Sequence, residues 1–161
     1  MTMEAPAVLA GSDIFERILG ADGPLVVLET DQAEMLIEQF RQLARRNGQT
    51  AYLWREGAGL ASLREGEVRV PGCLRMGDTL RYVLQSMHFG VYLFADVGVP
   101  ISSANLSLLR QLTRSRSTHV RRVVLLTASP QLADSLGGIA LALRRREARV
   151  QPRLRDGRWV T

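Results

Sequence analysis

The chain has 161 residues, of which 46% are hydrophobic and 23% charged, and this is the size and composition of one globular domain. All 21 basic residues are arginine, which excludes a working P-loop NTPase and a Schiff-base enzyme, because both need a lysine. The single cysteine, Cys73, excludes an intrachain disulfide and a cysteine-based zinc cluster, and we interpret it as a semi-buried loop residue. The acidic N-terminus and the short apolar runs predict a cytoplasmic protein without a signal peptide or a transmembrane helix.

The net charge of +5 is unevenly distributed along the chain. Residues 1–109 carry 9 arginines and 13 acids, whereas residues 110–161 carry 12 arginines and 3 acids. A basic C-terminal third favours an anionic partner such as a nucleic acid, a nucleotide or an acidic protein surface. A solvated basic edge that keeps the protein soluble explains the same pattern, and both readings stay open.

The first third of the chain predicts a helix, a strand and a second helix. Ser12 is expected to cap a short helix that ends at Gly20. The continuous apolar run 25–28 predicts a strand that is buried on both faces. Thr30 is expected to cap the next helix, which ends at Gly48.

A second strand is predicted at 50–54, where aromatic residues alternate, and it leads into a glycine-bearing loop at 57–59. Residues 60–76 show no clear period and predict an irregular excursion with a brief strand at 68–70. Asp78 is then expected to cap a helix that runs to about residue 89.

Gly90 is expected to close this helix, and the apolar run 91–96 is the clearest strand in the chain. A helix follows that starts at Ser103 or Asn105.

The last third predicts two further strands, a short helix and a hairpin. Residues 120–127 form an apolar strand and 130–135 a short helix. Residues 139–143 fit a strand or a helix, and their alternation favours a strand. The pair Asp156-Gly157 is a tight-turn signal that predicts a terminal hairpin within 153–160.

Strands separated by helical segments indicate βαβ crossovers and therefore a mostly parallel sheet. We expect a single three-layer α/β domain over residues 1–161, with helices on both faces of the sheet. Because the first strand runs directly into a helix without a glycine-rich turn, we expect this fold to lack a Walker A loop.

Two acids stand at the carboxyl ends of predicted strands, where α/β sheets commonly bind ligands. Glu29 follows the first strand, and Asp96 follows the run 91–95 in a pattern similar to a Walker B motif. A structural or loop-capping role explains Asp96 equally well. The loop 57–59 lacks the third glycine of a dinucleotide fingerprint and is interpreted as a turn.

Catalytic equipment is otherwise missing from the sequence. His88 and His119 lack a second histidine at helical metal-site spacing, and the serines show no nucleophile-elbow motif. We therefore expect no enzymatic activity, no metal and no cofactor.

Clustered arginines with neighbouring serines can hold phosphate groups. A solvated or inter-subunit face is the alternative for these residues. The candidate ligand-binding residues are Arg114, Arg116, Arg144, Arg145, Arg146, Arg153 and Asp156.

Several hydrophobic motifs carry a resemblance to a known family. They are Leu25–Thr30, Tyr52-Leu53-Trp54, Val91–Asp96, Leu108–Leu112 and Val123–Pro130. Over roughly residues 24–130 the chain resembles the region that precedes the ATPase module in certain cyanobacterial and chloroplast-type AAA proteins. The resemblance implies a bacterial, stand-alone pseudo-ATPase domain that has the strands of a RecA-like fold, lacks a working Walker A loop and carries no catalytic residue.

These observations predict a non-catalytic regulatory or scaffolding module that docks onto another protein. The alternative is a sensor that binds a nucleotide, a cyclic dinucleotide or a nucleic acid through the C-terminal arginines. A homodimer is a further expectation, in which the basic hairpin of one copy meets acidic helices of another near Asp31, Glu34 and Glu38.

Overall fold

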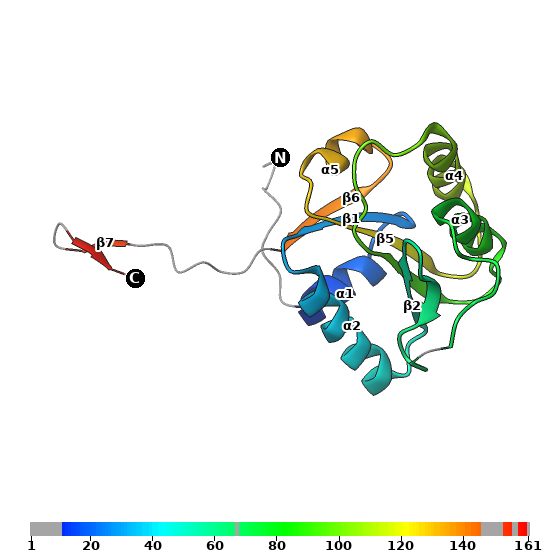
Figure 1. Cartoon of the computed structure of the whole chain (residues 1–161), viewed down its shortest axis with the longest axis horizontal. Helices are drawn as coiled ribbons and strands as arrows, with labels where there is room; N and C mark the ends of the chain where they lie inside the picture. Colours follow the sequence, from blue (N-terminus) through cyan, green and yellow to red (C-terminus); the bar gives the residue numbers. More distant parts are fainter. Residues whose placement is uncertain (1–10, 67, 146–152, 156–157, 161) are drawn as a thin grey trace.

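A six-stranded sheet forms the centre of the computed structural model, which describes residues 11–66, 68–145, 153–155 and 158–160 (Figure 1). The strands lie in the order β3-β2-β4-β5-β1-β6, and every neighbouring pair is parallel except β2 with β3. Their bounds are Leu25–Thr30 (β1), Ala51–Arg55 (β2), Gly59–Ser62 (β3), Gly90–Phe94 (β4), Arg121–Thr127 (β5) and Leu141–Arg145 (β6).

Helices cover both faces of this sheet. The helices are α1 (Gly11–Leu19), α2 (Ala33–Asn47), α3 (Met76–Gln85), α4 (Ser103–Arg114) and α5 (Gln131–Ser135). Helices α1 and α2 lie on one face, whereas α3, α4 and α5 lie on the other (Figure 1). Because side chains alternate along a strand, β1 sends Val26 and Leu28 into the first layer and Leu25 and Val27 into the second. The predicted three-layer, mostly parallel α/β fold is confirmed and is consistent with a RecA-like fold.

The region 60–76 is more regular than its sequence predicts. Strand β3 forms an antiparallel hairpin with β2, and residue Ala61 makes an isolated bridge with Arg69. The turn between the two strands requires positive φ angles at Gly57 (78°) and Gly59 (83°), which only glycine adopts without strain. The loop 57–59 is therefore a hairpin turn, and its short partner strand was missed because it holds only four residues.

Two predicted helix starts are wrong by a few residues. Ser12 lies inside α1 and not before it. Thr30 ends β1 instead of capping α2, because its Oγ1 accepts a hydrogen bond from the backbone N–H of Gln32 at 3.0 Å and so forms a tight turn ahead of the helix.

The predicted boundaries of α3 are also wrong. The helix begins at Met76, two residues before Asp78, and ends at Gln85 because Ser86 is extended. Gly90 is thus the first residue of β4 and not a helix cap. A Cβ atom at this position would lie 2.8 Å from the ring of Tyr92, so close packing explains the glycine.

The C-terminal hairpin is confirmed, with β7 (Arg153–Arg155) antiparallel to β8 (Arg158–Val160). It forms a two-stranded sheet of its own, separate from the six-stranded sheet. The turn residues Asp156 and Gly157 lie outside the described residues.

Two adjacent arginines at the start of β5 tie both helix layers to the sheet. The buried Arg121 donates from Nη1 to the carbonyl oxygens of Val83 and Leu84, both at 2.9 Å, at the end of α3. On the other face Arg122 donates to carbonyls at the end of α1, including that of Ile18 at 2.9 Å. Each guanidinium thus donates to carbonyls in the last turn of a helix, where donors from within the helix run out.

We predict that Arg121→Met lowers the free energy of unfolding by about 2–4 kcal/mol, because the buried carbonyls at the end of α3 lose their donors. Urea denaturation measures this loss. Arg110→Met is the matched control, since Arg110 is exposed on α4, and it should change the stability by less than about 0.5 kcal/mol. Equal stabilities of the two variants would contradict the assigned role of Arg121.

Candidate functional site

The carboxyl-terminal edge of the sheet is the place where α/β folds commonly bind their ligands. In this structure the junction between β1 and α2 consists of two residues, Asp31 and Gln32. A phosphate-binding loop needs several glycine-bearing residues at this place, so that backbone N–H groups can surround the phosphate. Neither of the two junction residues is a glycine.

Glu29 lies at the same strand end and is only 7% exposed. Its Oε2 lies 2.9 Å from Nε of Arg144, and the two residues are register partners in β1 and β6. A buried charge needs an opposite charge, and this pair supplies it. The sequence-predicted candidates Glu29 and Arg144 are thus held by one another.

Asp96 follows β4 after one intervening residue and takes a left-handed conformation, with φ at 55°. Aspartate tolerates this conformation better than most residues do. Its carboxylate is exposed and lies 3.9 Å from Nη1 of Arg55. Arg55 also binds Glu34 at 2.7 Å, and this hydrogen bond lowers the pKa of Glu34 and raises that of Arg55. The three side chains connect β2, α2 and the loop after β4.

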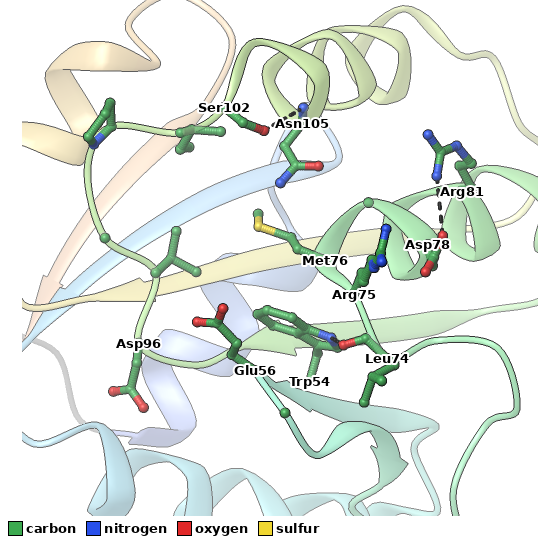
Figure 2. A pocket seen from close by; sticks show the side chains of 16 residues that line it. Trp54, Glu56, Leu74, Arg75, Met76, Asp78, Arg81, Asp96, Ser102 and Asn105 are labelled. Carbon is green, nitrogen blue, oxygen red and sulfur yellow. Dashed lines mark hydrogen bonds and ion pairs between the residues drawn. The ribbon is translucent and has the colours of Figure 1, made fainter.

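A groove of about 750 Å³ opens beside this cluster, between the ends of β2 and β4 and the beginnings of α3 and α4 (Figure 2). This is within the range of about 300–1,000 Å³ that is typical of ligand pockets. Its apolar lining is contributed by Trp54, Leu74, Met76, Val97, Pro100 and Ile101. Its polar lining is contributed by Glu56, Arg75, Asp78, Arg81, Asp96, Ser102 and Asn105.

The wall of the groove at residues 73–75 is held by side-chain hydrogen bonds. Trp54 donates from Nε1 to the carbonyl of Leu74 at 3.1 Å, and Thr79 donates to the carbonyls of Cys73 and Arg75 at 3.1 and 2.9 Å. Cys73 itself is 3% exposed, and burial raises the pKa of its thiol. Cys73 therefore has a structural position behind the groove.

The far side of the groove is the contact between the beginnings of α3 and α4. Ser102 caps α4 by accepting a hydrogen bond from the backbone N–H of Asn105 at 3.2 Å. The side chain of Asn105 points toward α3 (Figure 2), where a Cβ atom at Gly77 would lie 3.0 Å from its Oδ1. A glycine at this position lets the two helices approach closely.

The charges of the groove are divided between its walls. Glu56 and Asp96 follow β2 and β4, whereas Arg75 and Arg81 belong to the α3 side. Arg81 pairs with Asp78 at 3.3 Å within α3. The groove thus offers an acidic wall, a partly neutralised basic wall and an apolar floor.

The arginine candidates whose side chains the structure describes lie at two opposite edges of the sheet. Arg114 ends α4 and Arg116 follows it, both exposed and close in sequence to the first residue of β5. Arg144 lies at the opposite edge, because β5 and β6 both run parallel to β1. The backbone of Arg145 ends β6 and that of Arg153 begins β7, while Arg146 and Asp156 lie outside the described residues.

The two histidines are both exposed at the amino-terminal edge, with His88 before β4 and His119 before β5. Among the described residues no group of three or more His, Cys, Asp or Glu side chains could hold a metal ion. The helices of the same part of the chain are also too short or too polar to cross a lipid bilayer.

Sequence reasoning identified Asp96 at this edge but missed the groove next to it. Arg75 directly precedes α3 and Asn105 lies in the first turn of α4, each after an irregular loop, and no motif marks them. The rule that ligands bind beyond the carboxyl ends of parallel strands would have pointed to Glu56 and to the loop 97–101.

Comparison with known families agrees with this architecture. A family model described as the N-terminal domain of SpoVK-like AAA ATPases matches residues 12–143. No curated protein sequence matches the chain. The match covers the whole six-stranded sheet except the last residues of β6. The chain therefore belongs to the family of SpoVK-like AAA ATPase N-terminal domains.

Proposed function

We propose that this chain is a non-catalytic regulatory module of pseudo-ATPase type that docks a segment of another protein in the groove between α3 and α4. The observation that carries the proposal is the two-residue junction between β1 and α2, beside the ion pair of the buried Glu29 with the half-buried Arg144. It leaves no phosphate loop at the strand end where a RecA-like ATPase would hold its nucleotide.

Electrostatics at this strand end supports the same proposal. Asp31 and Glu34 are exposed beside the junction, and acids in this position repel a polyphosphate. The chain contains no lysine that could compensate for them. The edge is therefore better suited to a cationic or neutral partner than to a nucleoside triphosphate.

Exposed apolar side chains support docking of a protein at the groove. Leu74 lines the groove and is 58% exposed, and Val99 is 43% exposed in the loop 97–101, whose other residues mostly line it. Large apolar side chains next to a hollow with charged walls are typical of protein-binding surfaces. Membership in a family of AAA ATPase N-terminal domains is compatible with such a role.

The arginine-based sensor is less well supported by the same geometry. Arg144 is committed to Glu29, and Arg114 and Arg116 lie at the opposite edge of the sheet. A single phosphate ligand has no surface on which it would meet all of these residues. Docking of a protein segment is therefore the function that we favour.

The first prediction concerns nucleotides. Titration with ATP and Mg²⁺ should give no saturable heat of binding up to about 1 mM ligand, a concentration at which even weak specific sites are detected. The rate of ATP hydrolysis should equal that of the Asp96→Ala variant. Saturable binding, or hydrolysis that disappears in Asp96→Ala, would disprove the non-catalytic assignment.

The second prediction concerns the groove. Leu74→Glu should weaken capture of the native partner about tenfold or more, because it places a charge among the apolar contacts. The tagged full chain is used to co-purify proteins from its native host, and the amounts recovered by each variant are compared by quantitative mass spectrometry.

Met87→Glu is the matched control, since Met87 is 77% exposed and lies before β4, at the opposite edge of the sheet from the groove. It should recover the same proteins as the unmodified chain. The groove is not the docking surface if every protein that Met87→Glu recovers is also recovered in equal amount by Leu74→Glu.

A further inference from the structure

The chain leaves the main sheet at the edge that carries the groove. Strand β6 is parallel to β1, so its last residue, Arg145, lies at the carboxyl-terminal edge. The groove begins at β4, three positions away in the order β4-β5-β1-β6. At about 4.8 Å per strand this separation is about 14 Å. Residues 146–152 span up to about 23 Å when extended, so the residues that follow can reach the groove.

The residues beyond β6 lie outside the family match, which ends at residue 143. Residues 146–161 contain five arginines and two acids and also the apolar residues Leu154, Trp159 and Val160. We call residues 146–161 the C-terminal segment. Its sequence combines positive charge with large apolar side chains, and a docking peptide for an apolar groove with an acidic wall needs both.

The edge around the groove has the complementary charge. Asp31, Glu34, Glu56 and Asp96 are exposed there, and Arg55 neutralises only part of the group. Arg75 lies on the α3 side and reduces the attraction at that wall alone. Asp96 belongs to the loop after β4, in which Val99 is exposed.

The hairpin within the segment needs a further surface. Strands β7 and β8 have three residues each, and among the residues that the structure describes they pair only with one another, with Leu154 opposite Trp159 in the register. An isolated two-stranded hairpin is marginally stable in water and gains stability when it packs against another layer. The groove is an apolar surface within its reach.

We infer that the C-terminal segment docks in the groove of its own chain and competes there with the partner protein. The contact joins the basic segment to the acidic wall and places apolar side chains of β7 and β8 against the floor. Tethering favours the chain's own segment over that of a second copy, because it gives the segment a high effective concentration at the groove. The inference rests on the proposed docking function of the groove.

Disulfide trapping in the full chain tests this contact. In a Cys73→Ala background, Leu74→Cys is combined with Thr161→Cys, and oxidation is followed by gel mobility and peptide mass spectrometry. The 74–161 disulfide should form within one chain about tenfold or more faster than the control disulfide of Met87→Cys with Thr161→Cys, because only position 74 borders the groove. The rate should fall as salt is added, since ionic strength screens the attraction between charges.

The relative rates of disulfide formation decide whether the C-terminal segment docks in the groove. Equal rates for the two cysteine pairs would overturn the contact, and a disulfide formed only between two chains would show that a second copy is the occupant. The variant Arg153→Glu, Arg155→Glu and Arg158→Glu should slow the 74–161 reaction, and an unchanged rate would contradict the role of charge. Circular dichroism and cooperative unfolding verify that each variant is folded. The co-purification result on Leu74→Glu does not depend on the outcome of this test, so the two proposals can fail separately.

Discussion

The fold depends on the way in which one strand holds helices on both of its faces. Arg121 and Arg122 are neighbours in β5, so their side chains leave the strand in opposite directions. One binds the end of α3 and the other the end of α1, through carbonyl oxygens rather than carboxylates. Arginine suits this task because its planar group presents several donors at fixed angles. Two of the chain's many cations are therefore structural.

The same contact positions the groove from a distance. Arg121 holds the last turn of α3, and the first turn of that helix forms one wall of the groove. The helix has ten residues and is roughly 15 Å long, because each residue rises about 1.5 Å. Fixing its last turn therefore also fixes the position of its first turn at the groove. At the groove end, Trp54 and Thr79 hold the segment that enters the helix. The wall is thus attached to the sheet at both of its ends.

The sequence allowed the layers of the fold to be predicted but not the details of its edges. Continuous apolar runs such as 25–28 identified the buried strands, because only a strand covered on both faces tolerates them. Helix starts at Ala33 and Met76 were missed, since neither helix has a side-chain cap. Gly90 was misassigned as a helix cap because the glycine is required by close packing against the Tyr92 ring. Local turn chemistry does not reveal such packing.

The candidate site was harder to predict for a related reason. Asp96 was found because it follows an obvious strand, but the groove next to it is assembled from three separate segments of the chain. Charge counts along the sequence suggested one basic surface, whereas Arg121 and Arg144 are each occupied by internal partners. Only the three-dimensional arrangement distinguishes an arginine that supports the structure from one that is free to bind.

The pairing of β1 with β6 has a consequence for synthesis of the protein on the ribosome. Strand β1 is among the first elements to be made, yet Glu29 receives its cation from Arg144, more than a hundred residues later. Until that strand emerges, β1 has an open strand edge, and unpaired edges promote aggregation. The six-stranded sheet can therefore be completed only after almost the entire family domain has been translated.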